Sequence, residues 1–581
     1  MVDYHWEITE LTPEQQQLQQ QLQQELNISA SVARMLVVRN VHTAQEAREF
    51  VKPSLDRLHD PFLMKDMDKA VERLTRALEN QEKILIYGDY DVDGTTAVAL
   101  MYRFLKPMVK DLDYYIPDRY TEGYGISFKG IDYAVENHVT LVIALDCGIK
   151  AVDKIKYAND KHIDFIICDH HTPGEIIPDA VAVLNMKRKD CNYPYKELSG
   201  CGVGFKLAQA YTQSHGLPLK DLVPLLQLLA MSIASDIVPI TGENRILEYF
   251  GLRQLNRAPF AGLQALMQVA SIEQGKLNIN DLVYKIGPRI NASGRMKSGR
   301  DAVELLISDD TAEAMTHATG VNSYNDERQH CDKETTEQAL TILTQDPENA
   351  TKHTTVVFSP NWHKGVVGIV ASRLTETYYR PTIVLTAGDG DIISGSARSV
   401  GGFDLYTAID SCRDLLTNFG GHAFAAGLSM HLKDLLEFKT RFEQYVAAHI
   451  LPSQLRPTLH IEAEIQLKEV EELCNISRYL EPFGPGNPRP IFLTRHLINN
   501  RDTRTVGKNN EHLRLDLTDT TAAIYGIAFG RADMDLPIRN GNAVDVCYEL
   551  EENTFRNKTT IQMMAQDIKL CSTKETPKDL V

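Results

Sequence analysis

Short apolar runs alternate with longer amphipathic stretches through the first half of the chain. The clearest runs occupy residues 84–87, 141–145 and 165–168. Apolar runs of this length are typical of strands buried on both faces of a parallel sheet, and their alternation with helical stretches predicts strand–helix–strand units. We therefore expect strands at 84–88, 112–116, 141–146, 164–169 and 181–185, and an apolar helix at 222–235.

The middle of the chain predicts a second unit of the same class. Residues 311–345 are polar with helical spacing, which indicates a long connecting helix, interrupted near Gly320. The first α/β domain would then span 61–310. A smaller α/β domain is expected over 346–452, with apolar strands at 355–358 and 381–385.

Both ends of the chain depart from this pattern. Residues 453–572 contain many short alternating strands separated by turn residues, which predicts a small β-barrel of the OB-fold type. Residues 573–581 are expected to form a disordered tail. Residues 1–60 predict a helical extension with Leu18, Leu22 and Leu26 in one narrow apolar stripe. Such a stripe is typical of a surface helix, and a partner-binding helix is the alternative.

Each of the three clearest apolar runs ends in acid or imidazole. The first runs into the segment that holds Asp89, Asp91 and Asp93, the second into Asp146, and the third into Asp169-His170-His171. Because ligands gather outside the carboxyl ends of the strands in open α/β sheets, we expect these side chains to meet at one edge. The sequence therefore predicts a metal site there.

The spacing of the first acidic segment supports this prediction. In an extended segment, Asp89, Asp91 and Asp93 would point the same way and repel one another, and a cation removes the conflict. Gly88 and Gly94 leave space for a tight turn and a ligand. An acidic turn with solvated side chains is the alternative, and the two further acidic or imidazole strand ends argue against it.

A two-cation centre would use about six ligands. Asp236 ends the apolar helix, where a carboxylate meets the unfavourable end of the helix dipole unless a cation is near. Two cations can bind the attacking hydroxide and the leaving oxygen of a phosphodiester together, so no nucleophilic side chain is needed. Carboxylate with imidazole suits Mn²⁺ better than Ca²⁺, with Mg²⁺ as a further candidate, and the absence of thiolates argues against zinc. The six proposed ligands are Asp89, Asp91, Asp93, Asp146, His170 and Asp236, with Asp169 and His171 as further catalytic residues.

Other segments predict contacts to phosphate. Ser396 and Arg398 place a hydroxyl beside a guanidinium, which binds phosphate in a bidentate manner. Gly421 and His422 lie in a segment that permits close backbone approach, with a turn leading into a helix as the alternative. Residues 287–295 form a polar, glycine-punctuated loop, which indicates either a backbone clamp for nucleic acid or an ordinary domain junction. The candidate contacts in that loop are Arg289, Asn291 and Arg295.

Composition limits the class of protein. Hydrophobic residues make up 43% of the 581-residue chain and charged residues 24%, as in globular proteins. No apolar run approaches the roughly 20 residues of a membrane span, and residues 1–24 do not resemble a secretory signal. The nine cysteines include no CxxC pair, which favours a reducing cytoplasm. The net charge of −17 argues against non-specific nucleic-acid binding, but bound cations or a local basic groove would change that balance.

The motifs, taken together, resemble the DHH phosphoesterase superfamily. As a full series they resemble the bacterial RecJ family of single-strand-specific exonucleases over roughly residues 60–570. The segments that carry the resemblance are 87–94, 145–148, 169–171, 234–239, 287–291, 362–365, 395–398, 420–422 and 481–488.

This resemblance implies a 5′→3′ exonuclease that acts on single-stranded DNA with Mn²⁺ or Mg²⁺. It implies a DHH domain joined by a long helix to a DHHA1 domain around a narrow passage, with an OB-fold that grips the strand. Ser396 and Arg398, with Arg119, would contact the 5′-terminal phosphate, Arg295 the scissile region, and His363 the DNA. The family also implies a role in recombination and repair, with single-strand binding protein and a RecQ-type helicase as partners. We expect a cytoplasmic monomer.

Two other functions are compatible with a DHH core. One is a phosphodiesterase that acts on short oligonucleotides or cyclic dinucleotides, although a small substrate would need no OB-fold. The other is a non-catalytic DNA-binding scaffold, whose sequence would lack metal ligands. Here every expected acid and imidazole is present.

Overall fold

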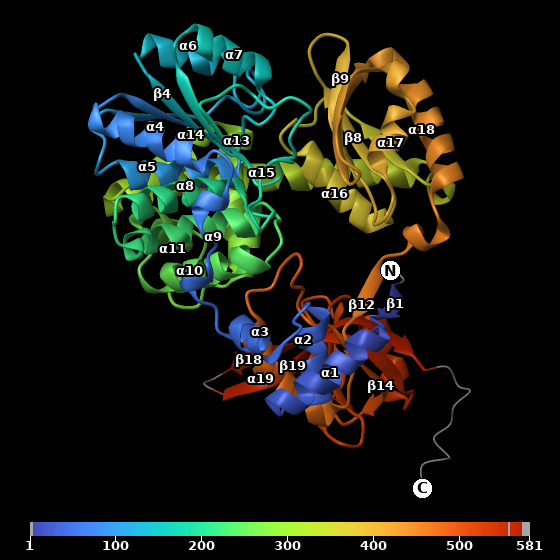
Figure 1. Ribbon diagram of the computed structural model, residues 1–581. Helices are drawn as coiled ribbons and strands as arrows, with labels where there is room; N and C mark the ends of the chain where they lie inside the picture. The colour runs from blue at the N-terminus through green and yellow to red at the C-terminus, as the bar shows by residue number, and fades with distance from the viewer. Residues whose placement is uncertain (1–3, 556–557, 572–581) are drawn as a thin grey trace. The chain divides into compact units, whose positions relative to one another are not determined.

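A computed structural model describes residues 4–555 and 558–571 (Figure 1). The predicted tail at 573–581 lies outside the described residues. The chain forms two compact units. One spans Ser54–Leu455, and the other joins the described residues up to Pro53 with those from Arg456 onward.

The first unit contains a fully parallel five-stranded sheet, as the apolar runs predicted. Its order is β3-β2-β4-β5-β6. Tyr87 pairs with Ala144, and Leu145 with Cys168, so the carboxyl ends of the three central strands are level. The strands are β2 (Ile84–Tyr87), β3 (Leu112–Tyr115), β4 (Leu141–Leu145), β5 (Asp164–Cys168) and β6 (Ala182–Leu184).

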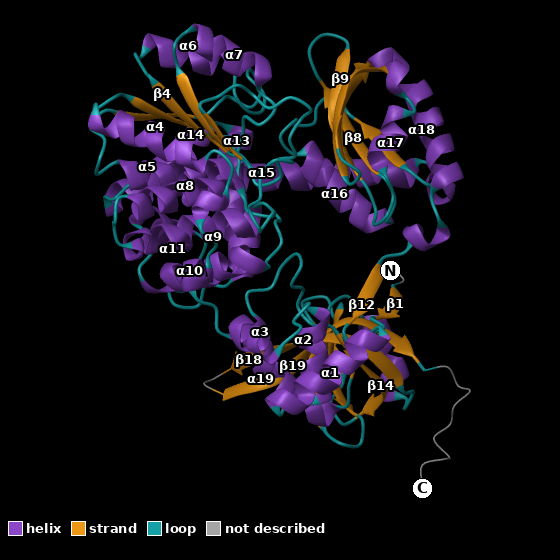
Figure 2. Cartoon of the chain, viewed as in Figure 1, coloured by secondary structure: helices purple, strands orange, loops and turns teal. Residues whose placement is uncertain are grey.

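Alternate side chains of this sheet enter two separate cores. Ile84, Ile86 and Leu141 join the core formed with α4 (Met67–Glu79), α5 (Val92–Leu105), α8 (Gly200–Ser214) and α9 (Leu226–Ser235). Leu85 and Val142 join the core formed with α6 (Phe128–Glu136) and α7 (Val152–Asp160) on the other face. Figure 2 shows helices on both sides of the strands. Burial on both faces explains why these strands read as unbroken apolar runs.

Further helices complete this domain. Residues 287–295, expected to be a loop, belong instead to helix α13, and Pro288 is tolerated because it lies in the first turn. A π-helical segment at Leu282–Ile286 leads directly into this helix. These helices are α10 (Gly242–Arg257), α11 (Ala261–Val269), α12 (Ile279–Asp281), α13 (Gly287–Met296) and α14 (Gly299–Ile307).

The long connecting helix α15 runs without a break from Thr311 to Gln345, so the predicted interruption at Gly320 was wrong. A helical glycine costs only about 1 kcal/mol relative to alanine. The buried Ala318 and Val321 on either side pack into the first core and hold the helix across that position. Near its end, Leu343 packs into a core of the second α/β domain. The helix therefore joins the cores of both domains.

The second α/β domain has a mixed sheet of order β10-β11-β9-β8-β7, in which only β7 and β8 are parallel. Helix α16 (Val367–Tyr378) packs on Val357 and Val384, while α17 (Leu405–Asp410) and α18 (Leu435–His449) share a core with Ile383 and Leu385. The strands are β7 (Thr355–Phe358), β8 (Thr382–Ala387), β9 (Ile392–Arg398), β10 (Leu416–Gly421) and β11 (Ala425–His431).

The second compact unit combines the N-terminal helices with a β-barrel. Leu22 is fully buried and shares one core with Leu473 and Phe492, and Leu18 and Leu26 pack partly buried against it. Residues 13–26 therefore form the expected surface helix with one narrow apolar stripe. Strand β1 (His5–Ile8) also pairs in parallel with β12 (Thr458–Ile461). The helices are α1 (Pro13–Leu26), α2 (Ala30–Val38) and α3 (Ala44–Val51).

The predicted OB-fold is confirmed as a seven-stranded sheet of order β13-β14-β18-β19-β17-β16-β15. An additional pairing between β14 and β16 closes it. Its strands are β13 (Ala463–Glu464), β14 (Phe492–Asn499), β15 (Arg504–Val506), β16 (His512–Thr518), β17 (Ala523–Ala528), β18 (Val544–Phe555) and β19 (Lys558–Leu570), with helices α19 (Val470–Leu480) and α20 (Asp535–Arg539). Within the described residues, no helix has the length and apolar character needed to cross a membrane.

Candidate metal centre

The acidic segment after β2 turns directly into helix α5. Asp91 caps this helix by accepting a hydrogen bond from the Gly94 N–H at 3.0 Å, and Asp93 lies in the first helical turn. The segment is therefore not extended through Asp93, as the spacing argument assumed. A Cβ at position 94 would lie 2.6 Å from the backbone nitrogen of Asp89, so only glycine allows this close turn.

The helical turn divides the six expected ligands between overlapping sets. In each set the potential ligand atoms lie within 4.8 Å of one another. Asp146 and His170 each belong to two sets, and of the two only the carboxylate of Asp146 has two oxygens with which to contact two cations. The sets are Asp89, Asp91 and Asp146; Asp93, His170 and Asp236; and Asp146, His170 and His171.

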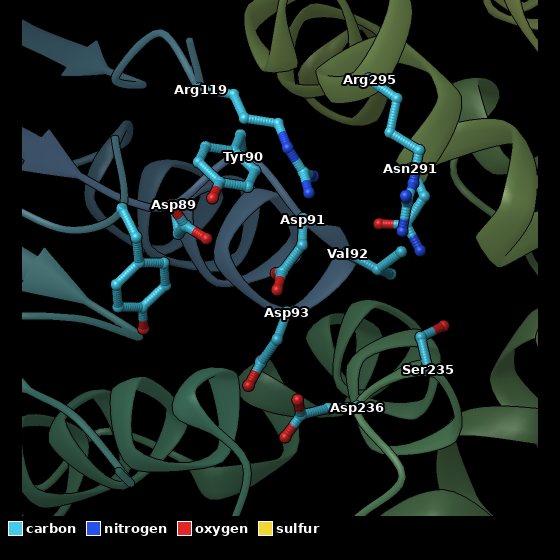
Figure 3. Close-up of a pocket in the computed structure, with 11 residues that line it drawn as sticks. Asp89, Tyr90, Asp91, Val92, Asp93, Arg119, Ser235, Asp236, Asn291 and Arg295 are labelled. Atoms are coloured by element: carbon cyan, nitrogen blue, oxygen red, sulfur yellow. The ribbon is translucent and has the colours of Figure 1, made fainter. Parts of the chain in front are cut away.

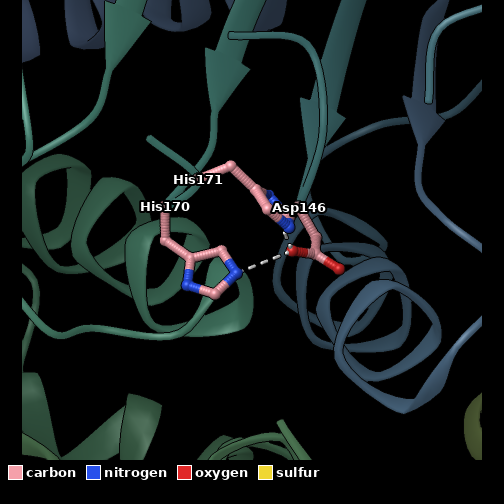
Figure 4. A group of neighbouring side chains, drawn as sticks. All are labelled: Asp146, His170 and His171. Atoms are coloured by element: carbon pink, nitrogen blue, oxygen red, sulfur yellow. Dashed lines mark ion pairs between the residues drawn. The ribbon is translucent and has the colours of Figure 1, made fainter. Parts of the chain in front are cut away.

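His170 faces carboxylates from three different elements. Its Nε2 lies 3.2 Å from Asp146 Oδ1, 3.5 Å from Asp236 Oδ2 and 3.8 Å from Asp93 Oδ2. Figure 4 shows the approach of both imidazoles to Asp146. Both ring nitrogens of His170 are buried without a hydrogen-bond partner among the described residues. The same holds for both Asp89 oxygens, Asp146 Oδ1 and Asp236 Oδ2. Buried polar atoms normally have a hydrogen-bond partner. These oxygens and nitrogens have none, so they fit the role of ligands to divalent cations.

The electrostatics of the centre agree with this fit. Burial, and then the charge of neighbouring carboxylates, raises the pKa of Asp89, Asp91 and Asp146. The same causes raise the pKa of Asp236 to about 9. Burial lowers the pKa of His170, which keeps its ring neutral and able to coordinate. Cations would restore the carboxylates to their ionised form.

Asp169 has a different role from the other acids. Its oxygens accept hydrogen bonds from the backbone N–H groups of Ile149, His170 and His171, and from His171 Nδ1 at 2.8 Å. Burial alone would raise the pKa of Asp169, but these bonds outweigh it and lower that pKa. Burial likewise opposes protonation of His171, but Asp169 outweighs it and raises the pKa of His171. His171 is thus oriented as a proton donor.

Asp146 adopts a backbone conformation that few non-glycine residues take. Its φ is +59°, at the end of β4. The Tyr124 hydroxyl donates to its carbonyl at 2.7 Å, and its own N–H donates to the Cys168 carbonyl at 2.9 Å. Strain of this kind is found at functional sites. Tyr124 was not predicted as a site residue. The only indication in the sequence is that it lies in a polar segment between two glycines.

A cavity of about 280 Å³ opens on the carboxylates (Figure 3). Three residues predicted to contact DNA, Arg119, Asn291 and Arg295, line it together with the acids. Tyr90 and Ser235 also line it and were not predicted.

A second cavity, of about 400 Å³, shares Tyr90 and Arg119 with the first. Ser396 lines it, as do Lys364 and Asn418. Lys364 was not predicted as a DNA contact, because only its neighbour His363 was chosen from the segment 362–365. His363 accepts a hydrogen bond from the Gly365 N–H at 3.0 Å and so shapes the local turn.

Two further predicted contacts, Arg398 and Arg289, also make hydrogen bonds within the protein. Arg398 donates to the Ala397 carbonyl at 2.8 Å, and its NH2 lies 3.2 Å from where a Cβ on Gly368 would stand, near Ser396 Oγ. Arg289 donates to Asn322 Oδ1 at 2.9 Å and to the Lys285 carbonyl at 2.7 Å, which ties α13 to α15.

Gly421 and His422 form the turn of the β10–β11 hairpin, not a turn into a helix. Gly421 has a φ of +153°, and a Cβ there would lie 2.3 Å from the Ala425 carbonyl oxygen. The His422 N–H donates to the same carbonyl at 2.8 Å. Gly420, one residue earlier, lines the second cavity.

Positive charge gathers on the side of the first cavity that the acids leave free. Burial, and then repulsion from Arg119, Arg328 and Arg398, lowers the pKa of Arg295 to about 10. Arg295 Nη1 donates to the Gly365 carbonyl at 3.0 Å. The Tyr120 hydroxyl donates to the Arg295 carbonyl at 2.6 Å. A bound phosphate would relieve this repulsion.

The fold and the site together define a metal-dependent phosphoesterase of the DHH type. Family models match in chain order: DHH family, N-terminal domain, at 83–233; DHHA1 domain at 351–448; and RecJ OB domain at 461–567. The chain belongs to the RecJ family of single-stranded-DNA-specific exonucleases.

The relatives cover almost the whole chain. RecJ of Bacillus subtilis is 35% identical over 565 residues, which cover 97% of this chain and 70% of the relative. RecJ of Escherichia coli is 31% identical over 554 residues, which cover 92% and 95%. The crystal structure of RecJ with Mn²⁺ from Thermus thermophilus has a TM-score of 0.83 at 27% identity and covers 97% of this chain and 79% of that one. The structure of the same enzyme with Mg²⁺ has a TM-score of 0.77 at 26% identity, with coverage of 97% and 78%.

Proposed function

We propose that this chain is a metal-dependent exonuclease that removes nucleotides from the 5′ end of single-stranded DNA. The observation that carries the proposal is the first cavity, where carboxylates suited to cations face Arg119 and Arg295. A phosphodiester is the group that both sets of side chains would bind. The related structures with Mn²⁺ and Mg²⁺ support two divalent cations of either kind as cofactors.

The residues divide the chemistry of phosphodiester hydrolysis between them. When bound, the two cations polarise the scissile phosphate and lower the pKa of an attacking water. The residues that would hold them are Asp89, Asp91, Asp93, Asp146, His170 and Asp236. Protonated His171, oriented by Asp169, donates a hydrogen bond to a phosphoryl oxygen. Arg295 binds the same phosphate from the opposite side, which stabilises the charge that develops in the transition state.

The second cavity supports the 5′→3′ direction. Arg119 faces both cavities, and Ser396 lines the second, with Arg398 beside it. A terminal phosphate held there would place the next phosphodiester at the acids. The path of the DNA would be shaped by Arg289, His363, Gly421 and His422. Asn291 would contact the DNA directly.

Strand selectivity follows from the OB-fold. Tyr525 and Phe529 are 49% and 62% exposed, and the Arg514 guanidinium lies 5.1 Å from the Tyr525 ring centre. Exposed aromatics with a neighbouring cation are suited to stacking unpaired bases. A phosphodiesterase for short oligonucleotides or cyclic dinucleotides would need no such surface.

The expected partners follow from the family resemblance. The proposal includes a cytoplasmic monomer that acts in recombination and repair with single-strand binding protein and a RecQ-type helicase. The nine cysteines are all unpaired, in agreement with a reducing compartment.

A nuclease assay tests the proposal directly. Single- and double-stranded DNA, labelled at either end, is incubated with Mn²⁺, Mg²⁺ or EDTA. We expect release of the 5′ label first, only from single strands and only with metal. Equal activity on blunt duplex, or hydrolysis of dinucleotides without hydrolysis of longer DNA, would contradict it.

A further inference from the structure

The carboxylate of Asp93 is held by three donors from two helices outside its own. The backbone N–H of Gly200 donates to Oδ2 at 2.6 Å, and that of Cys201 to Oδ1 at 2.8 Å. The Ser232 hydroxyl donates to Oδ1 at 2.7 Å. Ser232 is fully buried and Asp93 is 2% exposed. These bonds are therefore protected from competition with water.

The direction of the hydrogen bonds leading to Asp93 is determined by chemistry. An ionised carboxylate only accepts, so Ser232 gives its single proton to Asp93. Ser199, whose Oγ lies 2.6 Å from Ser232 Oγ, must then donate to Ser232. Ser199 in turn accepts from the Gly202 N–H at 3.1 Å as the N-cap of α8. The hydroxyls of Ser199 and Ser232 therefore each have a single orientation in this series of hydrogen bonds.

Ser232 also holds a second ligand of the same set. Its backbone carbonyl accepts the Asp236 N–H at 2.9 Å, because Asp236 is the C-cap of α9. One residue thus connects Asp93 and Asp236, which share a set with His170.

Gly200 makes this arrangement possible. A Cβ at that position would lie 2.5 Å from Asp146 Oδ1 and 2.6 Å from Asp146 Cβ. The amino end of α8 therefore contacts Asp93 with its N–H groups and Asp146 with its bare Cα. A larger residue would displace one ligand or the other.

The count of acceptor positions has a consequence for the cation. A carboxylate offers about four acceptor positions, two on each oxygen. Cys201 and Ser232 fill both positions on Oδ1, and Gly200 fills one on Oδ2. One position remains, on the oxygen that lies 3.8 Å from His170 Nε2.

We propose that Ser232, with the amino end of α8, is a positioning element that restricts Asp93 to a single metal-facing oxygen and so selects against Ca²⁺. Ca²⁺ takes six to eight oxygen ligands and readily uses bidentate carboxylates, whereas Mg²⁺ requires near-octahedral geometry. A carboxylate with one available oxygen suits Mg²⁺ and Mn²⁺ better. The inference rests on the two-cation centre of the proposed function.

Calorimetric titration of the metal-free protein with Mn²⁺ and with Ca²⁺ tests it. In Ser232→Ala we expect one Mn²⁺ binding step to weaken about tenfold, as is typical when a partner of a metal ligand is removed. We expect Ca²⁺ affinity to fall less, so that the preference for Mn²⁺ over Ca²⁺ drops at least about threefold. Loss of a purely structural hydrogen bond would lower the melting temperature and leave this preference unchanged.

Two further variants complete the design. Ser232→Cys keeps a weak donor of similar size, and we expect the same shift at smaller amplitude, so it carries the test if the alanine variant does not fold. Ser214→Ala removes a hydroxyl from the far end of α8, where it donates to the Tyr211 carbonyl, and should bind both ions as the unaltered protein does.

The outcomes separate the two proposals. Mn²⁺ affinity and ion preference within twofold of the unaltered protein in both Ser232 variants would overturn the role of Ser232. Failure of the unaltered protein to bind Mn²⁺ at all would instead overturn the metal centre.

Discussion

The two walls of the first cavity differ in charge and in the parts of the chain that build them. The acidic wall consists of Asp89, Asp91, Asp93 and Asp236, and the basic wall of Arg119 and Arg295 (Figure 3). The acids are placed by backbone, at a strand end or helix terminus. The arginines reach the cavity on long side chains. The cavity therefore combines a rigid wall with one whose position depends on side-chain packing.

Each wall carries an electrostatic penalty that a ligand would remove. Burial and mutual repulsion raise the pKa of Asp236 to about 9 and lower the pKa of Arg295 to about 10. Cations relieve the acidic wall, and a phosphate relieves the basic wall. Substrate and metal should therefore bind cooperatively, since each neutralises the charge that opposes the other.

Removal of the shared acid should have the largest effect. Asp146→Asn keeps a residue that tolerates positive φ but loses the charge, and we expect turnover to fall by at least about 10³-fold. The measurement is single-strand exonuclease rate with Mn²⁺, with circular dichroism as the control for folding. Near-normal turnover would show that Asp146 does not hold the reactive cations.

The basic wall is tested at Arg295. Arg295→Ala should lower kcat by about 10²-fold, because it removes a charge-assisted contact to the scissile phosphate, while Mn²⁺ affinity without DNA stays within threefold. Arg413→Ala is the matched control, since Arg413 pairs only with Asp410 at the surface among the described acids. If Arg295→Ala lost Mn²⁺ binding as well, the two walls would not be separable.

The second cavity should affect end preference more than chemistry. Arg398→Ala should reduce the preference for 5′-phosphorylated over 5′-hydroxyl ends by about tenfold, because a bidentate guanidinium contact is lost. Competition between the two substrates measures this preference. An unchanged ratio would place the terminal phosphate elsewhere.

The smallest expected effect is on stability in EDTA. The pKa of Asp236 is about 9 in the folded protein against an ordinary value of 3.8. The folded state therefore binds more protons between these values, and stability falls as pH rises through that window. We expect the melting temperature to drop by a few degrees between pH 5.5 and pH 8.5, and by less in Asp236→Asn. Saturating Mn²⁺ should remove or reverse the trend. A melting temperature that rises with pH in EDTA would contradict the electrostatic account of the acidic wall.

Most of the metal centre could be predicted from sequence, because five of its six proposed ligands follow apolar strands and only Asp236 follows a helix. Asp146 comes directly after β4 and His170 two residues after the end of β5, and parallel strands bring their carboxyl ends to one edge. The local path was not predictable in the same way. The alternating spacing of Asp89, Asp91 and Asp93 suggested an extended segment, whereas α5 begins at Val92 and divides the acids between two sets.

The sequence alone determined the parallel α/β class, the order of the short apolar strands, and the acids and imidazoles that follow them. Local pattern specifies local structure of this kind. Tertiary packing decided the rest. It buried Leu22 against a barrel more than 400 residues away, kept α15 continuous through Gly320, brought Arg328 toward Arg295, and placed the Ser232 hydroxyl against Asp93. These outcomes depend on contacts between distant segments. The energies of such contacts cannot be inferred from a local pattern of hydrophobic and polar residues.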